Sequence, residues 1–114
     1  MGVSTLSVEQ RASNGFALLN RVGPEDWQER VEPSLLDIDH GYFCVLGQVY
    51  AEDGNGQGYE YALGHLDFLA DGDALERFGF YGLNEEDGHA LTKAWCALLA
   101  GEAKPVEVTA VMSA

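Results

Sequence analysis

The chain has 114 residues, nineteen acidic and six basic, and its net charge is −13 at pH 7. A field of that sign repels nucleic acid and anionic membranes, so we expect neither as a direct partner. At 46% hydrophobic residues the chain is too apolar for intrinsic disorder. Its length is typical of one domain, and we treat residues 1–114 as a single domain.

The first part of the chain predicts two helices. Ser7 and Gln10 stand at capping-box spacing, and apolar residues follow at helical spacing at Val8, Ala12, Phe16 and Leu19. Asn14-Gly15 lowers the helix propensity by about 1 kcal/mol and is also compatible with a break. Gly23-Pro24 ends this helix and begins a short second one, which Pro33 closes.

Residues 42–51 and 59–69 are ambiguous. Their aromatic and β-branched side chains favour a hairpin across the turn-rich segment 52–58, whereas leucines spaced by three (Leu63, Leu66, Leu69) favour a helix. Periodicity alone leaves both structures open.

The last third predicts two more helices. The first begins at Asp73, which has Glu76 at capping-box spacing, and it stops at Gly79. The second is capped by Asn84, carries Glu85, Glu86 and Asp87 in its first turn, and ends at Gly101. Its apolar stripe is Leu91, Ala94, Trp95 and Leu98. Residues 102–114 form a flexible tail or an edge strand.

Four segments resemble, in order, a family of small uncharacterised proteins of actinobacteriophages and actinobacterial genomes. They are Trp27-x-Glu29-Arg30-Val31-x-Pro33-x-x-Leu36-Asp37, Cys44-Val-Leu-Gly-Gln48-Val-Tyr50, Phe78-Gly79-Phe80 and Ala90-Leu-Thr-x-Ala94-Trp95. The resemblance covers residues 16–100 and is most specific at Cys-Val-Leu-Gly-Gln. It implies a mostly helical phage or prophage accessory protein, and it transfers no activity and no functional residue. The glycine-rich insertion at 54–58 departs from the family pattern.

These patterns predict a mainly α, compact single domain of four to six short helices. The helix over 84–100 lies at its centre, and the expected core residues are Trp95, Leu91, Leu98, Phe78, Leu19 and Trp27. The alternative is an α+β fold with a hairpin over 42–69 and a C-terminal edge strand.

Catalytic and metal motifs are weak. Asp37, Asp39, His40 and Cys44 are metal-ligand types at close spacing, and His40 with Cys44 also has the spacing of a thiolate–imidazole pair. The other histidines, His65 and His89, are isolated, and neither an orienting group nor an oxyanion site accompanies the pair. Residues 53–64 open like a calcium loop and then lack its closing glutamate, because position 12 is Gly64. We therefore expect no cofactor and no metal, with Asp37 and Asp39 as solvated loop acids.

No apolar run reaches the length of a membrane span, and the N-terminus lacks the pattern of a signal peptide, so we expect a cytoplasmic protein without a membrane partner. Cys44 and Cys96 are then expected to be reduced and buried.

The charge distribution suggests the function. Residues 35–91 hold twelve of the acids and one base, Arg77. We expect a protein that binds and modulates a host protein, rather than an enzyme. In one version, acids in 67–87 imitate the phosphates of DNA and occupy the basic cleft of a DNA-binding protein; they are Asp67, Asp71, Asp73, Glu76, Glu85, Glu86 and Asp87.

In the other version, the charge confers solubility and an aromatic surface makes the contact. Self-association is a further expectation. Six aromatic residues are more aromatic surface than one small core readily hides, and they predict a symmetric homodimer: Tyr42, Phe43, Tyr59, Tyr61, Phe80 and Tyr81.

Overall fold

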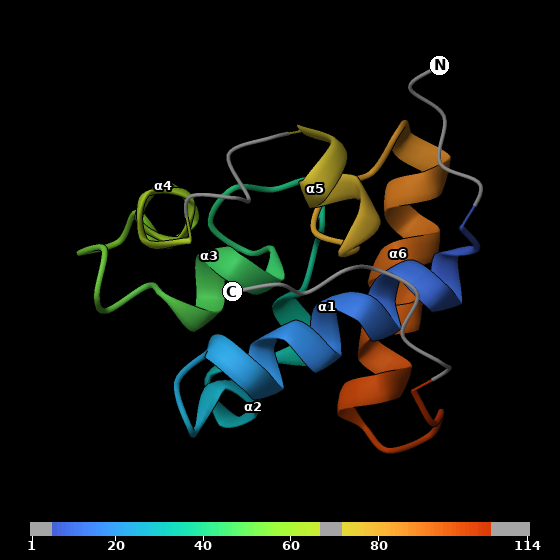
Figure 1. The fold of residues 1–114 in the computed structure, drawn as a ribbon, viewed down its shortest axis with the longest axis horizontal. Helices are drawn as coiled ribbons and strands as arrows, with labels where there is room; N and C mark the ends of the chain where they lie inside the picture. The colour runs from blue at the N-terminus through green and yellow to red at the C-terminus, as the bar shows by residue number, and fades with distance from the viewer. Residues whose placement is uncertain (1–5, 67–71, 106–114) are drawn as a thin grey trace.

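The structure is a computed structural model that describes residues 6–66 and 72–105. Its helices are α1 (Val8–Val22), α2 (Trp27–Arg30), the 3₁₀ helix η1 (Pro33–Leu35), α3 (Val45–Val49), α4 (Gly58–His65), α5 (Gly72–Arg77) and α6 (Glu85–Leu99) (Figure 1). No strand occurs in these two stretches. The prediction of a mainly α fold is confirmed. The hairpin alternative is wrong, because α3 and α4 occupy residues 45–49 and 58–65. The C-terminal edge strand of that alternative falls on residues 106–114, which lie outside the described residues.

α1 is continuous through Asn14 and Gly15, and both residues make close contacts with the end of α5 and the residue after it. The capping box predicted for it is present, with the Ser7 hydroxyl accepting from the Gln10 amide and the Gln10 side chain accepting from the Ser7 amide. Asn14 Nδ2 donates to the Arg77 carbonyl at 3.0 Å. A Cβ on Gly15 would collide with the Phe78 carbonyl oxygen. The glycine thus allows the chain after α5 to pass directly against α1.

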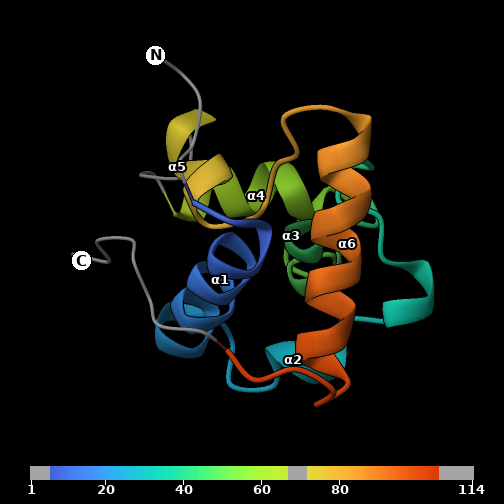
Figure 2. The same ribbon diagram turned by 90° about the vertical axis from the view of Figure 1, so that its right-hand side faces the viewer.

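α6 packs against α1, and the two helices lie side by side in Figure 2. Asn84 caps it, since its side-chain oxygen accepts from the Asp87 amide at 2.9 Å. The helix ends before Gly101, whose φ of 75° is the left-handed conformation typical of a helix stop. α5 begins at Gly72, one residue before the predicted cap Asp73.

Trp95 is the centre of the core and is fully buried. Its indole nitrogen donates to the Gly79 carbonyl at 2.7 Å, so the polar edge of the ring is satisfied in the interior. The ring stacks on Phe80, with centroids 5.6 Å apart, and meets Trp27 edge-on at 6.3 Å. All six predicted core residues are buried: Trp95, Leu91, Leu98, Phe78, Leu19 and Trp27.

The short helices α3 and α4 depend on burial. Val45, Leu46 and Val49 of α3 have no exposed surface, and α3 packs directly on α4. Between the two helices, Asn55 and Gly56 both have positive φ and form a turn, as the glycine-rich composition of 52–58 predicts. Among the helices described, none combines the length and the hydropathy that crossing a bilayer requires.

Candidate functional site

Two loops meet at the N-terminal end of α6. The first connects η1 to α3, and the second connects α5 to α6. The Asp39 carboxylate of the first loop lies against Gly88, so closely that a Cβ there would come within 2.6 Å of the carboxyl carbon of Asp39. The Ile38 amide donates to Thr92 Oγ1 at 3.1 Å, and that hydroxyl donates to the Gly88 carbonyl at 2.9 Å. The first loop is therefore anchored on α6.

The junction of the two loops concentrates negative charge. Burial raises the pKa of Asp39 above its usual value, and the neighbouring Asp37, Glu85 and Asp87 carboxylates raise it further, while His89 acts in the opposite direction. None of the ion pairs within residues 6–66 and 72–105 includes Asp37, Asp39, Glu85 or Glu86, and all four side chains are exposed. The junction therefore presents four carboxylates to solvent, with His89 as the positive group beside Asp39.

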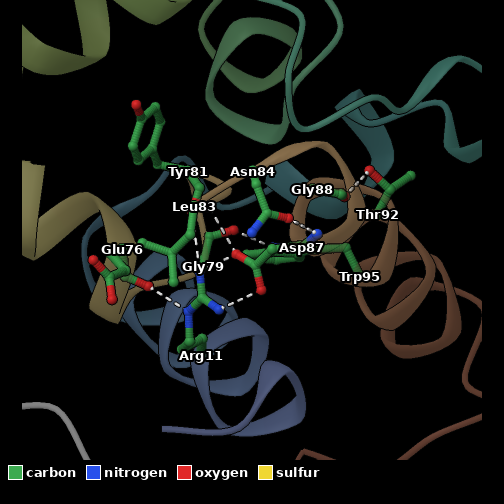
Figure 3. Close-up of polar contacts among 10 residues, drawn as sticks. All are labelled: Arg11, Glu76, Gly79, Tyr81, Leu83, Asn84, Asp87, Gly88, Thr92 and Trp95. Carbon is green, nitrogen blue, oxygen red and sulfur yellow. Dashed lines mark hydrogen bonds and ion pairs between the residues drawn. The ribbon is translucent and has the colours of Figure 1, made fainter. Parts of the chain in front are cut away.

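Asp87 has a structural role at this junction (Figure 3). Its two oxygens accept from the two terminal nitrogens of Arg11, both at 2.9 Å, and the same carboxylate accepts from the Leu83 amide at 2.8 Å. Arg11 also donates to the Glu76 carbonyl at 3.0 Å and to the Tyr81 carbonyl at 3.1 Å. The Arg11 hydrogen bond holds the pKa of Asp87 below its usual value. The pair thus fixes the second loop between α5 and α6.

The sequence analysis did not identify Arg11 as a buried residue, although its spacing carried the signal. Arg11, Asn14, Gly15 and Leu18 stand at i, i+3, i+4 and i+7, and all four are buried on one face of α1. A charged residue on such a face requires a buried partner of opposite charge. The sequence offers several acids for that role, and only the fold selects Asp87.

Exposed aromatic and apolar side chains accompany the acids on both loops. Tyr42 and Phe43 of the first loop are 62% and 40% exposed, and Tyr81 and Leu83 of the second are 51% and 44% exposed. The His40 ring packs on Phe43 with centroids 4.7 Å apart. Of the other aromatic residues considered from the sequence, Tyr61 is exposed, Tyr59 is half-buried and Phe80 lies in the core.

The seven acids proposed from the sequence for partner binding have different environments. Glu85 and Glu86 are exposed, and Asp87 is paired with Arg11. Glu76 is buried, and its Oε1 has no hydrogen-bond partner among the residues that the structure describes. Asp67 and Asp71 lie outside the described residues, as does the side chain of Asp73. Carboxylates available to a partner in the described part of 67–87 are therefore those of Glu85 and Glu86.

His40 and Cys44 do not form a thiolate–imidazole pair. Cys44 caps α3, where its sulfur accepts from the Gly47 amide at 3.3 Å, and burial raises the pKa of its thiol. His40 Nδ1 instead accepts from the Tyr42 amide at 3.2 Å. No group of three or more potential metal ligands occurs in the described part of the chain.

Cys44 is buried and both cysteines are free thiols, as expected. Cys96, which we also expected to be buried, is only half-buried.

Comparison with protein-family models, with curated proteins and with solved structures gives no match for this chain. The resemblance to small actinobacteriophage proteins accordingly stays a prediction.

Proposed function

We propose that this protein is a phage-type accessory protein that binds a basic host protein in the host cytoplasm and changes its activity. Binding uses the two-loop junction, which we define by its exposed acids and apolar side chains: Asp37, Asp39, Tyr42, Phe43, Tyr81, Leu83, Glu85 and Glu86. The observation that supports this proposal is the combination of exposed carboxylates with exposed aromatic rings on two loops that contact each other.

The junction is preorganised, which favours binding. The Asp37 amide donates to the Phe43 carbonyl at 3.1 Å, and the Gln48 side chain donates to the same carbonyl at 2.9 Å. The second loop is held by Arg11 and Asp87 as described above. Because these loops are already ordered, a partner does not have to overcome much of the conformational entropy that a disordered acidic segment would lose.

Acids and aromatic side chains would contribute differently to such a complex. Carboxylates steer a basic partner and raise the association rate, an effect that salt screens. Tyrosine and phenylalanine supply contact area at a low cost in side-chain entropy and are enriched at interfaces. The proposal therefore predicts an affinity that falls with salt and that also depends on Tyr42 and Phe43.

Affinity capture from host lysate, at two salt concentrations, tests the proposal. Three forms are compared: the wild type, Glu85→Gln/Glu86→Gln, and a control, Glu60→Gln/Glu102→Gln. The control removes the same charge from exposed positions outside the junction. We expect the same host protein with the wild type and the control at low salt, and a loss of most of it with Glu85→Gln/Glu86→Gln.

Tyr42→Ser/Phe43→Ser should also reduce capture, at both salt concentrations. Competition by duplex DNA would assign the interaction to the DNA-mimic version. Equal capture by Glu85→Gln/Glu86→Gln and by the control would contradict the proposal, as would capture of nothing above background by the wild type.

A further inference from the structure

A second surface feature lies between α1 and α6 and is chemically unlike the two-loop junction. It is a groove of ≈ 520 Å³ whose lining also includes residues 103 and 104. Its apolar lining consists of Val8, Ala90, Ala94, Ala97, Leu98 and Ala103. The small side chains of α6 leave this space open, and the size falls within the range of small-molecule sites in proteins.

The groove also concentrates positive charge in a strongly acidic protein. The sequence contains two lysines, Lys93 and Lys104, and both line this groove. Both are exposed, so their ammonium groups remain available to a ligand. One acid, Glu9, lines the opposite wall on α1. An apolar floor with two ammonium groups beside it is complementary to a molecule that has an apolar chain and an anionic head.

The net charge of the protein disfavours some of the molecules that could occupy such a groove more than others, because the protein repels negative charge. A second copy of the chain carries −13, and the two copies would repel each other strongly. An acidic helix of a partner would bring several negative charges into the same repulsive field. Among these negatively charged occupants, a molecule with one negative charge experiences the least repulsion and gains the same contact with the two lysines. The volume also suits a single alkyl chain better than a helix.

We propose that this groove binds a long-chain carboxylate. The alkyl chain lies along the alanines of α6, and the carboxylate lies at the lysine-bearing rim, where it accepts hydrogen bonds from Lys93 or Lys104. This inference is independent of the host-protein interaction proposed above, because the two surfaces share no residue.

Isothermal titration of the full chain with dodecanoate, below its micelle concentration, tests the proposal. We expect saturable binding of one molecule per chain. Octanoate should bind more weakly, by up to about fourfold for each methylene that it lacks inside the groove. Dodecyltrimethylammonium, which has the same chain and the opposite charge, should not compete for the site.

Three variants locate the site. Ala94→Leu should weaken dodecanoate binding at least tenfold, because the larger side chain occupies the groove. Lys93→Gln and Lys104→Gln should each weaken it about two- to fivefold, the effect typical of an exposed ion pair. Arg77→Gln is the control, since it removes an exposed base that does not line the groove and should leave the affinity unchanged. Circular dichroism of each variant checks that the fold is retained.

Several outcomes would overturn this inference. They include no binding of dodecanoate by the folded wild type, binding that is insensitive to Ala94→Leu, and displacement of bound dodecanoate by dodecyltrimethylammonium. A protein that light scattering shows to be a dimer, and that Ala94→Leu converts to a monomer, would instead assign the groove to a second copy of the chain.

Discussion

Arg11 and Asp87, 76 positions apart in the sequence, form a bidentate ion pair in which both nitrogen–oxygen distances are 2.9 Å. The Arg11 side chain is 2% exposed and that of Asp87 is 15% exposed. The pair connects α1 to the first turn of α6, and the remaining Arg11 donors hold the backbone of residues 76 and 81. One buried guanidinium therefore joins α1 to α5, to the loop after α5 and to α6, and it holds the second loop of the two-loop junction in place.

Removing one member of this pair should destabilise the protein strongly. We expect Asp87→Asn to lower the free energy of unfolding by about 3–5 kcal/mol, because it leaves the buried Arg11 charge uncompensated. Urea denaturation measures this change. The double variant Arg11→Met/Asp87→Asn should lose less than the sum of the two single variants, since neither charge remains. Additive losses would show that the two side chains do not interact energetically.

The same pair predicts a loss of stability in acid. Because the folded state lowers the pKa of Asp87 below its usual value of 3.8, the ionised carboxylate stabilises the fold above that pH. This stabilisation should decline as the pH falls below about 4 and through the pKa of the folded state. Asp39 acts in the opposite direction because its pKa is raised. The comparison is therefore made in an Asp39→Asn background.

Urea titrations between pH 7 and pH 2.5 measure this contribution. The Asp39→Asn protein should lose more stability across the acidic range than Asp39→Asn combined with Arg11→Met/Asp87→Asn. If the stability of the two proteins changed with pH in the same way, the Arg11–Asp87 pair would not be the cause of the loss of stability in acid.

Gly15 should be intolerant of a side chain although it lies inside a helix. Alanine is intrinsically favoured over glycine in helices by about 1 kcal/mol. At this position its Cβ would collide with the Phe78 carbonyl and lie 2.6 Å from the Trp95 ring. We expect Gly15→Ala to destabilise the protein by about 1–3 kcal/mol through overpacking.

Gly64 of α4 provides the matched control, since nothing lies within 4 Å of a Cβ built there. Gly64→Ala should leave stability unchanged or raise it by up to about 1 kcal/mol. Thermal unfolding of both variants measures the difference. Stabilisation by Gly15→Ala would mean that Phe78 does not pack directly against α1 at Gly15.

Trp95 should be the most sensitive core position. Its ring is fully buried, contacts Trp27 and Phe80, and donates to the Gly79 carbonyl. Trp95→Ala should cost about 3–5 kcal/mol, which is a large part of the stability of a small domain. Trp95→Phe keeps most of the ring contacts and loses the hydrogen bond, so it should cost less. Equal losses for the two variants, measured by urea denaturation, would contradict this account of the packing.

The sequence was sufficient to predict those features of the structure that depend only on residues close together in the chain. Ser7 with Gln10, and Asn84 with the Asp87 amide, form the predicted caps because each bond joins residues three positions apart. Leu91, Trp95 and Leu98 of α6 face the core because the helical period places them on one side of the helix, which is also a local effect. These signals do not require knowledge of the rest of the chain.

The secondary structure of residues 42–66 could not be predicted from local sequence signals. Composition supported a hairpin as well as helices, and α3 has only five residues, too few to be stable alone. It forms because Val45, Leu46 and Val49 are buried against other elements, and burial depends on the path of the whole chain.

The candidate site was decided almost entirely by tertiary structure. The sequence determined that the protein is acidic and that Glu85, Glu86 and Asp87 begin a helix. It did not determine that Asp87 is paired with Arg11 while Glu85 and Glu86 are exposed to solvent. Nor did it place Asp39 beside Gly88, 49 positions away. Such choices depend on long-range contacts, because the free energy of a charge is set by what surrounds it in space rather than by its neighbours along the chain.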